Sequence, residues 1–192
     1  MNRELSYQLS DDDLLHVLGT KDTRIVPYSE IHQYKTLDDL FGKDNRLIIL
    51  YISSVDGNTT SGHWTCLSRV HRNGKNIIEF NDSYSHMPDE ALKFIPKSIK
   101  KQTYQDKNYL TKLLYDYSLI PGNEIHYNEE KMQRMGEDIS TCGRHIMNRL
   151  YFYKVPLEKY QKLFEQLKGK NIDLDKASVY ISNYLMNKSH NN

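Results

Sequence analysis

The residues Thr141-Cys142-Gly143-Arg144 begin the segment around which we expect the fold to be built, a helix over residues 142–153. The residues at positions 138, 140 and 141 are Asp, Ser and Thr, which favour a helix N-cap. A helix N-terminus carries partial positive charge and free N–H groups, which stabilise a thiolate. Gly143 places no side chain over the sulfur, so a substrate has room to approach. Cys142 therefore has the properties of a nucleophile, which needs a base and an oxyanion donor from elsewhere in the chain.

Length and composition predict one small domain. The chain has 192 residues and a formal net charge of +1, which indicates a single domain, residues 1–192, without an overall charge that attracts nucleic acid. The two cysteines show no CxxC or Cys/His ligand spacing, so we predict no disulfide framework, no metal and no cofactor. The N-terminus lacks a signal-peptide apolar run, and the longest apolar run, residues 47–52, is too short to span a bilayer. We expect a soluble protein without a membrane partner, in a reducing compartment.

The order of predicted elements indicates an α+β fold. β-prone runs predict strands at residues 47–52, 63–70, 75–80 and 124–128, with Asn73-Gly74 as a hairpin turn. Helical patterns predict helices at residues 10–18, 37–41, 88–95, 97–114, 142–153, 156–168 and 173–186, and residues 20–45 are otherwise expected to be rich in loops. We predict a small mixed β-sheet whose histidine-bearing hairpin packs on a central helix with the cysteine at its N-terminus, flanked by further helices.

The strand that begins at Gly62 supplies a candidate base. Side chains alternate along a strand, so His63 faces one side of the sheet while Trp64 and Cys66 face the other. Cys66 then points away from the imidazole, and we predict it to be a small buried hydrophobic residue and not the nucleophile. A single histidine is weak evidence, because the chain contains eight and most are expected on the surface or in the core.

The other strand of the hairpin supplies a candidate acid. Pairing of the two strands returns Asp82 beside the strand that begins at His63. A carboxylate there accepts a hydrogen bond from one imidazole nitrogen and stabilises the imidazolium, leaving the other nitrogen for Cys142. An aspartate that caps the turn before Ser83 is an equally simple interpretation of the spacing.

Four motifs in this order resemble a known superfamily. They are Gly62-His63-Trp64, Phe80-Asn81-Asp82-Ser83-Tyr84, Gln133 and Thr141-Cys142-Gly143. Together they resemble the adenovirus-type maturation proteases and SUMO-specific cysteine proteases, and are most similar to the small proteases of virophages, Polinton-like elements and large DNA viruses. The order His, Asp, Gln, Cys differs from papain-like enzymes, in which the cysteine comes first. The motifs span residues 62–143, and the two ends match only in general helical character.

The resemblance implies a thiol endopeptidase with a Cys-His-Asp triad. It implies that Cys142 is the nucleophile and that His63 is the general base, or the imidazolium of an ion pair with Cys142. Asp82 is then the residue that orients His63. The side-chain N–H of Gln133 and the backbone N–H of Cys142 are the implied oxyanion donors. The resemblance also implies that Trp64 and Gly143 belong to the substrate groove.

The sequence departs from the family at two points. Gln133 lies nine residues before Cys142, a longer gap than in the adenovirus and SUMO-protease members, so the intervening loop must bulge. Gln102 and Gln105 are alternative oxyanion donors. Some viral relatives carry Asn where other members carry an acid, which makes Asn81 an alternative third catalytic residue.

The resemblance also implies a biological setting. The expected substrates are viral capsid or other structural precursor proteins, cleaved at glycine-containing sites during virion maturation, in the host-cell cytoplasm (viral factory) and in the virion. Alternatives are a deconjugating protease for a ubiquitin-like modifier, which would need residues 20–60 as a docking surface, and a thiol acyltransferase. A non-enzymatic nucleic-acid-binding module is a further alternative. It would use the lysines of the Lys97–Lys112 face, which are simpler to interpret as a solvated helix face and otherwise predict weak nucleic-acid contact.

Overall fold

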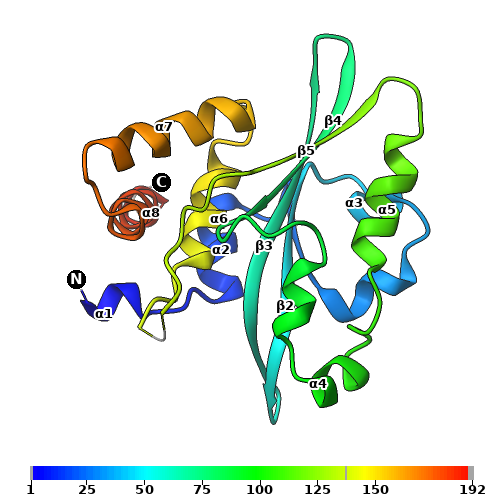
Figure 1. Ribbon diagram of the computed structural model, residues 1–192, viewed down its shortest axis with the longest axis horizontal. Helices are drawn as coiled ribbons and strands as arrows, with labels where there is room; N and C mark the ends of the chain where they lie inside the picture. The colour runs from blue at the N-terminus through cyan, green and yellow to red at the C-terminus, as the bar shows by residue number, and fades with distance from the viewer. Residues whose placement is uncertain (1, 137, 190–192) are drawn as a thin grey trace.

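The computed structural model describes residues 2–136 and 138–189, which form a central sheet with helices on both sides (Figure 1). The described strands are β1 (Thr23–Pro27), β2 (Arg46–Asp56), β3 (Thr59–Arg72), β4 (Lys75–Asp82) and β5 (Asn123–Tyr127). They lie side by side in the order of the sequence. β3 pairs antiparallel with β2 and β4, whereas β1 pairs parallel with β2 and β5 pairs parallel with β4. This mixed sheet with surrounding helices confirms the predicted α+β class.

The helices divide between the two faces of the sheet (Figure 1). One face carries α1 (Asn2–Leu5), α2 (Asp11–Leu18), α6 (Cys142–Tyr151), α7 (Leu157–Gly169) and α8 (Leu174–Ser189). The other is covered by the 3-10 helix η1 (Tyr28–Gln33), α3 (Leu37–Phe41) and α5 (Tyr109–Ser118), while the 3-10 helix η2 (Glu90–Phe94) and α4 (Lys97–Gln102) contact β2. No described helix is long and apolar enough to cross a lipid bilayer.

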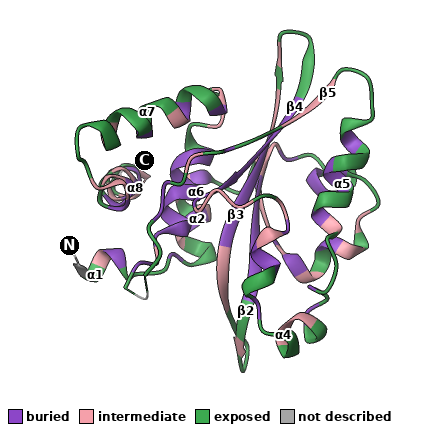
Figure 2. Ribbon diagram, in the orientation of Figure 1, coloured by how far each residue is buried: buried purple, intermediate pink, exposed green. Residues whose placement is uncertain are grey.

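The sheet is buried on both faces because β2 is apolar at every position from 47 to 52. Its odd-numbered residues there face a core shared with η1, α3 and α5, and its even-numbered residues face a core shared with α2 and α6. Figure 2 shows buried residues along the middle of the sheet and on α6. Residues 142–150 of α6 are all buried, as expected for a central helix.

β3 is longer than β4, and this difference leaves space for a site. The last residue of β4, Asp82, pairs with Thr65. Residues 59–64 of β3 therefore have β2 on one side and, among the described strands, no strand on the other. The connections that follow β4 and β5 lie in the space where β4 would have continued.

The same end of the β2–β3 pair is irregular and tightly packed. A bulge shifts the register between Ile52 and Ser54. Gly62 approaches β2 so closely that a Cβ atom would lie 1.8 Å from the carbonyl oxygen of Tyr51, so a glycine is required. The Gln105 side chain replaces a strand partner here. Its Oε1 accepts from the N–H of Ile52 at 2.8 Å and its Nε2 donates to the Ile52 oxygen at 2.7 Å.

The hairpin and most helices agree with the sequence predictions. Asn73 and Gly74 have φ angles of +52° and +75°, as a two-residue hairpin turn requires. β5 and helices α2, α3, α7 and α8 lie within a few residues of their predicted positions. β2 and β3 are longer than predicted, and Gly57-Asn58 joins them as a second tight hairpin turn. α6 ends at Tyr151, before the predicted end at Tyr153.

Three segments differ from the predictions. Residues 20–45 contain the short edge strand β1, where Arg24 and Pro27 obscure the strand pattern, and η1. The segment at 88–95 forms only a 3-10 helix, because Asp89 adopts a left-handed φ of +67° at its start. The predicted helix at 97–114 is two helices, α4 and α5, separated at residues 103–108, where Tyr104 has a φ of +51°.

Candidate active site

Three of the predicted site residues line one cavity of about 330 Å³. His63 reaches the cavity from β3, Cys142 from the first turn of α6, and Gln133 from the connection between β5 and α6. His63 lies opposite Tyr51, on the sheet face that packs against α5, whereas Cys142 belongs to the core on the α6 face. The two side chains come together beyond the end of β4, where that strand no longer separates the two layers.

His63 is hydrogen-bonded to Asp82. The Nε2 atom of His63 lies 2.9 Å from Oδ2 of Asp82, and the Asp82 side chain is 1% exposed. The register explains the contact, because Asp82 pairs with Thr65, whose side chain faces the same side as that of His63. The other carboxylate oxygen, Oδ1, accepts the backbone N–H of Tyr84 at 2.7 Å. Asp82 therefore has both geometries considered from the sequence: it caps the turn with one oxygen and holds the imidazole with the other.

The pair is strongly polarised. Burial alone lowers the pKa of His63, but the charge and hydrogen bond of Asp82, with smaller contributions from Cys142, raise it to about 10. Burial alone raises the pKa of Asp82, but the charge and hydrogen bond of His63, with smaller contributions from the nearby His86 imidazole and the hydrogen bond from the Tyr84 N–H, lower it to about 2. The pair is thus an imidazolium–carboxylate ion pair at neutral pH.

The backbone around Asp82 is fixed by Asn128, which follows β5. The Oδ1 atom of Asn128 accepts from the Asp82 N–H at 2.8 Å, and its Nδ2 donates to the Asp82 oxygen at 2.7 Å. Asn81, the alternative third residue, pairs with Cys66 in the ladder and so faces the α6 layer. Neither polar atom of its side chain has a hydrogen-bond partner among the described residues. The structure therefore places Asp82, and not Asn81, beside His63.

Gln133 is oriented by Ser83. The Ser83 hydroxyl donates to Oε1 of Gln133 at 2.6 Å, and the Ser83 carbonyl accepts the backbone N–H groups of Met132 and Gln133, each at 2.9 Å. Because the oxygen of the Gln133 amide is occupied, its NH₂ group is the end left to interact with a molecule in the cavity. Of the two alternative donors, Gln102 is exposed and Gln105 is bound to β2, and neither lines the cavity.

Cys142 is the first residue of α6, so the N–H groups at this end have no intrahelical acceptor. One sequence expectation is corrected here. Thr141 occupies the N-cap position, but its hydroxyl accepts no N–H of the helix, and its φ of −94° and ψ of 3° are not the extended backbone of a capping residue. The hydroxyl donates instead to the carboxylate of Asp175 on α8. Asp138, another expected N-cap type, lies in the preceding loop and is exposed.

Gly143 and Trp64 lie beneath the cavity and are not among its lining residues. A Cβ atom on Gly143 would lie 3.2 Å from Cβ of Leu9 and 3.3 Å from Cδ1 of Trp64. Trp64 is buried in the core shared with α2 and α6. Close by, the N–H of Ser140 donates to the carbonyl oxygen of Leu5 at 2.7 Å. Gly143 and Trp64 thus pack closely at the first turn of α6, next to the Cys142 that lines the cavity, and their assignment to the substrate groove stays a prediction.

Cys66 is separated from this chemistry. It is 1% exposed and packs in the core on the α6 face. Burial raises the pKa of its thiol to about 12, with Arg149 opposing this and Glu79 adding to it. A thiol with this pKa is not a nucleophile near neutral pH.

His86 is a site residue that the sequence did not indicate. Its Nδ1 lies 3.6 Å from Oδ2 of Asp82, and its ring packs against Phe94 with 5.2 Å between the centroids. Among the described residues, ligand atoms of His63, Asp82 and His86 lie within 4.8 Å of one another and form the one group with potential metal-ligand geometry. Nothing in its spacing from Asp82 marks His86 as functional. The same is true of Ser83, which holds Gln133.

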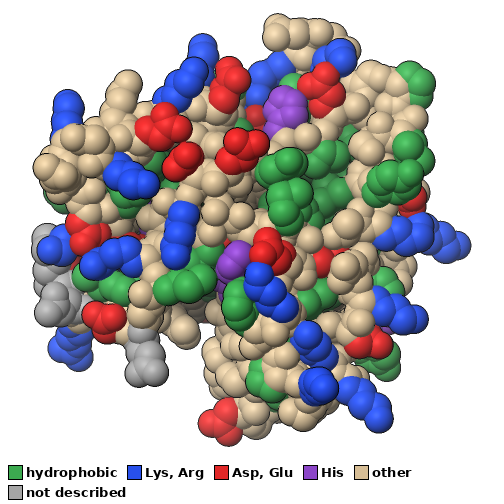
Figure 3. All heavy atoms as spheres, in the orientation of Figure 1, with side chains coloured by type: hydrophobic (Ala, Val, Ile, Leu, Met, Phe, Trp, Pro, Cys, Tyr) green, Lys and Arg blue, Asp and Glu red, His purple; other side chains and the backbone are tan. Residues whose placement is uncertain are grey.

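The predicted Lys97–Lys112 face is divided between two helices. Lys97, Lys100 and Lys101 lie on α4, Lys107 follows in the connection, and Lys112 lies on α5, where its Nζ pairs with Asp116 at 2.5 Å. Figure 3 shows Lys and Arg side chains at the lower right of this face of the molecule, near the place of α4 in Figure 1. α4 is close to the cavity, because Phe94 and Ile95 immediately before it line the cavity.

The arrangement can perform acyl transfer. It combines a thiol at a helix N-terminus, an imidazolium held by a buried carboxylate, and a side-chain amide whose NH₂ is directed to the same cavity. Such a set can attack a carbonyl, stabilise the resulting oxyanion and protonate a leaving group.

Comparisons with known proteins give one close relative. The chain is 32% identical over 169 residues to the protein described as "Uncharacterized protein V9" of Sputnik virophage, a match that covers 86% of this chain and 90% of that one. No known family profile matches the chain.

Solved structures give weaker matches. A crystal structure of ASFV pS273R protease matches with a TM-score of 0.42 and 13% identity, covering 77% of this chain and 59% of that one. A selenomethionine crystal structure of the same protease gives 0.39 and 16%, covering 77% and 60%. The protein AvrA, in the deletion variant delL154 with IP6 and CoA, gives 0.40 and 13%, covering 84% and 56%. The chain thus spans about three fifths of the length of these solved chains or slightly less.

Proposed function

We propose, from the geometry of its site, that this member of the family of the uncharacterized protein V9 of Sputnik virophage is a cysteine endopeptidase. The observation that supports the proposal is the position of Cys142, His63 and Gln133 on one cavity, with Asp82 buried behind His63. His63 and Asp82 lie more than fifty positions before Gln133 and Cys142 in the sequence. His63 is oriented by Asp82 and Gln133 by Ser83, and Cys142 is placed by its position at the first turn of α6.

The proposed reaction uses these groups in two steps. The Cys142 thiolate attacks a peptide carbonyl, and the Gln133 amide with the Cys142 N–H stabilises the oxyanion. His63 gives its proton to the leaving amine as the C–N bond breaks, leaving a thioester. Water then attacks the thioester while His63 takes a proton from it, which releases the acid and regenerates the ion pair.

The proposed substrates are viral capsid or other structural precursors, cleaved at glycine-containing sites in the host-cell cytoplasm and in the virion. Two observations support this setting. The relative is a virophage protein, and the motifs at residues 62–143 resemble viral maturation proteases. The cavity combines the polar groups of the site with apolar walls from Phe94, Ile95 and Met135, which suits a peptide backbone flanked by an apolar side chain.

The decisive experiment is cleavage of capsid precursors from a virus that encodes this chain. The purified protein and its Cys142→Ala and Cys66→Ala variants are incubated with the precursors, and new termini are mapped by mass spectrometry. We expect discrete new termini with the wild type and Cys66→Ala, and none with Cys142→Ala. Equal cleavage by Cys142→Ala would refute the proposal.

The alternative enzyme activities are tested on the same protein. A ubiquitin-like modifier carrying a C-terminal electrophile labels Cys142 if the chain deconjugates modifiers, and leaves it unlabelled if it is a maturation protease. Addition of a primary amine during turnover distinguishes hydrolysis, which gives only the acid, from acyl transfer, which gives an amide.

We also propose that the lysines near α4 make weak contact with nucleic acid. Their exposure and clustering support this. The contact is expected to weaken steeply with salt, and replacement of Lys97, Lys100 and Lys101 by Ala should remove it without changing peptide cleavage.

A further inference from the structure

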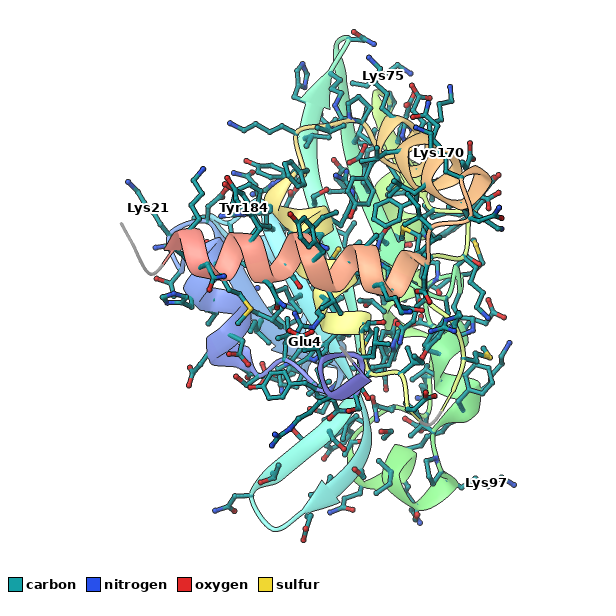
Figure 4. All side chains as sticks on the ribbon, turned by 90° about the vertical axis from the view of Figure 1, so that its left-hand side faces the viewer. Glu4, Lys21, Lys75, Lys97, Lys170 and Tyr184 are labelled. Atoms are coloured by element: carbon teal, nitrogen blue, oxygen red, sulfur yellow. The ribbon has the colours of Figure 1, made fainter. Side chains whose placement is uncertain are left out.

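Asp175, at the start of α8, is a buried acid that the catalytic machinery described above does not use. Its side chain is fully buried. Figure 4 looks onto α8, which crosses in front of α6. Asp175 therefore projects from the C-terminal helix into the space behind the cavity, toward the first turn of α6.

The carboxylate of Asp175 is fully used by donors from two segments. Its Oδ2 accepts the backbone N–H of Arg134 at 3.0 Å and the Arg134 Nε at 3.3 Å. Its Oδ1 accepts the Thr141 hydroxyl and lies 3.2 Å from Nε2 of His145. Each oxygen thus holds a different part of the chain.

The two segments held in this way carry the proposed reactive groups. Arg134 directly follows Gln133, and Thr141 directly precedes Cys142. The described residues between them, 135–136 and 138–140, are loop. The gap from Gln133 to Cys142 is therefore bridged by one side chain on α8, which accommodates the long spacing noted in the sequence.

We propose that Asp175 is a positioning residue that sets the distance between the Gln133 amide and the Cys142 thiol. This inference rests on the proposed function, because it assigns a role to the oxyanion donor of that reaction. Asp175 touches no substrate. It acts by holding the residues next to the two reactive groups in one register, and a displacement of about 1 Å between such groups typically slows a reaction about a hundredfold.

The Asp175→Asn variant tests the link with little change in shape. The Asn side chain has only one oxygen to accept hydrogen bonds, and its NH₂ group takes the place of the second oxygen, where it faces other donors. Either the Arg134 side or the Thr141 side must therefore be released. Thr141→Val removes the hydroxyl that Oδ1 holds next to Cys142, and leaves the Arg134 side and the His145 contact in place. Glu165→Gln is the matched control, because it makes the same carboxylate-to-amide change at an exposed position of α7, away from both links.

The measurement compares two reactions of the same thiol. Alkylation of Cys142 by iodoacetamide passes through no oxyanion, whereas its acylation by p-nitrophenyl acetate does. Rates are corrected with Cys142→Ala, and thermal unfolding verifies that each variant is folded. We expect Asp175→Asn to slow acylation about ten- to a hundredfold while alkylation changes less than about twofold. Thr141→Val should slow acylation in the same selective way, and Glu165→Gln should match the wild type.

Each outcome has a separate meaning. If acylation and alkylation fall by the same factor in Asp175→Asn and Thr141→Val, Asp175 contributes only to folding and the inference is overturned. If Asp175→Asn does not fold, Thr141→Val decides by the same criterion. If the wild type is acylated no faster than Cys142→Ala, the proposed function fails, and the role of Asp175 fails with it.

Discussion

Replacement of Asp82 by Asn should change the protonation of His63 more than any other single substitution. Asp82 is the largest source of the upward shift that brings the pKa of His63 from 6.5 to about 10. At about 1.4 kcal/mol per pH unit, this preference for the imidazolium is on the order of 5 kcal/mol. The remaining influences in Asp82→Asn are burial, which lowers the pKa, and a smaller upward contribution from Cys142. We therefore expect His63 to titrate at about 6.5 or below in the variant.

Two assays measure this effect. NMR titration of the histidine side chains, with His63 assigned from a His63→Gln spectrum, should show a protonated imidazole up to about pH 10 in the wild type only. At pH 8.5 the protonated fraction in Asp82→Asn should be roughly one part in a hundred or less. Peptide cleavage should then fall by about a thousandfold or more. His63 would lack the proton that it gives to the leaving amine, and its neutral imidazole would no longer be held in the productive tautomer.

Stability should follow the same charges. The folded-state pKa of His63 lies above 6.5, so its contribution to the free energy of unfolding is complete below pH 6.5 and is lost as the pH rises through about 10. The pKa of Asp82 lies below 3.8, so its contribution is present above pH 3.8 and is lost as the pH falls through about 2. Urea unfolding should separate wild type from Asp82→Asn at pH 5.5 and much less at pH 10.5. A His63 titration that is the same in both proteins would refute the reasoning.

Further substitutions test other parts of the site. Gln133→Ala should slow peptide cleavage about 100- to 1000-fold, measured as kcat, with little change in iodoacetamide labelling; equal loss of both would argue against an oxyanion role. Gly62→Ala should lower the free energy of unfolding in urea by more than about 3 kcal/mol, because its Cβ would lie 1.8 Å from the Tyr51 oxygen. Cys66→Ala should retain activity, and a dead but folded variant would place a second thiol in the reaction. Asn81→Ala should slow peptide cleavage by less than the roughly hundredfold expected for loss of a residue that orients the base. A larger decrease in rate would make Asn81 the third catalytic residue.

Much of the fold was predictable because its signals are local. The Asn73-Gly74 turn sets the hairpin register, and that register brings Asp82 to the strand that carries His63. The apolar run at 47–52 predicts a strand buried on both faces, which the structure confirms. A turn of two residues and a short apolar run each act within a few positions, so their consequences can be read directly from the chain.

The rest depended on contacts between distant segments. Thr141 is a good N-cap type, but its backbone is not extended, and its hydroxyl donates to Asp175, more than thirty positions later. Ser83 orients Gln133 and His86 approaches Asp82 only because the connections after β4 and β5 fold over the exposed end of β3. Neither connection has a periodic pattern, and side chains such as these have no characteristic spacing. The edge strand β1 was obscured for a related reason, since it pairs on one side only and needs little apolar sequence.

The packing of Leu5 on Ser140 and of Leu9 on Gly143 has a consequence for the order of synthesis. Leu5 and Leu9 leave the ribosome long before Ser140 and Gly143, so they lack these partners until residues 140–143 have been synthesised. If the proposed function is correct, a nascent chain contains the base His63 early and gains the nucleophile Cys142 only much later. Proteolysis can then begin only after Cys142 has been synthesised and its helix has packed, and until then the growing chain is spared from its own activity.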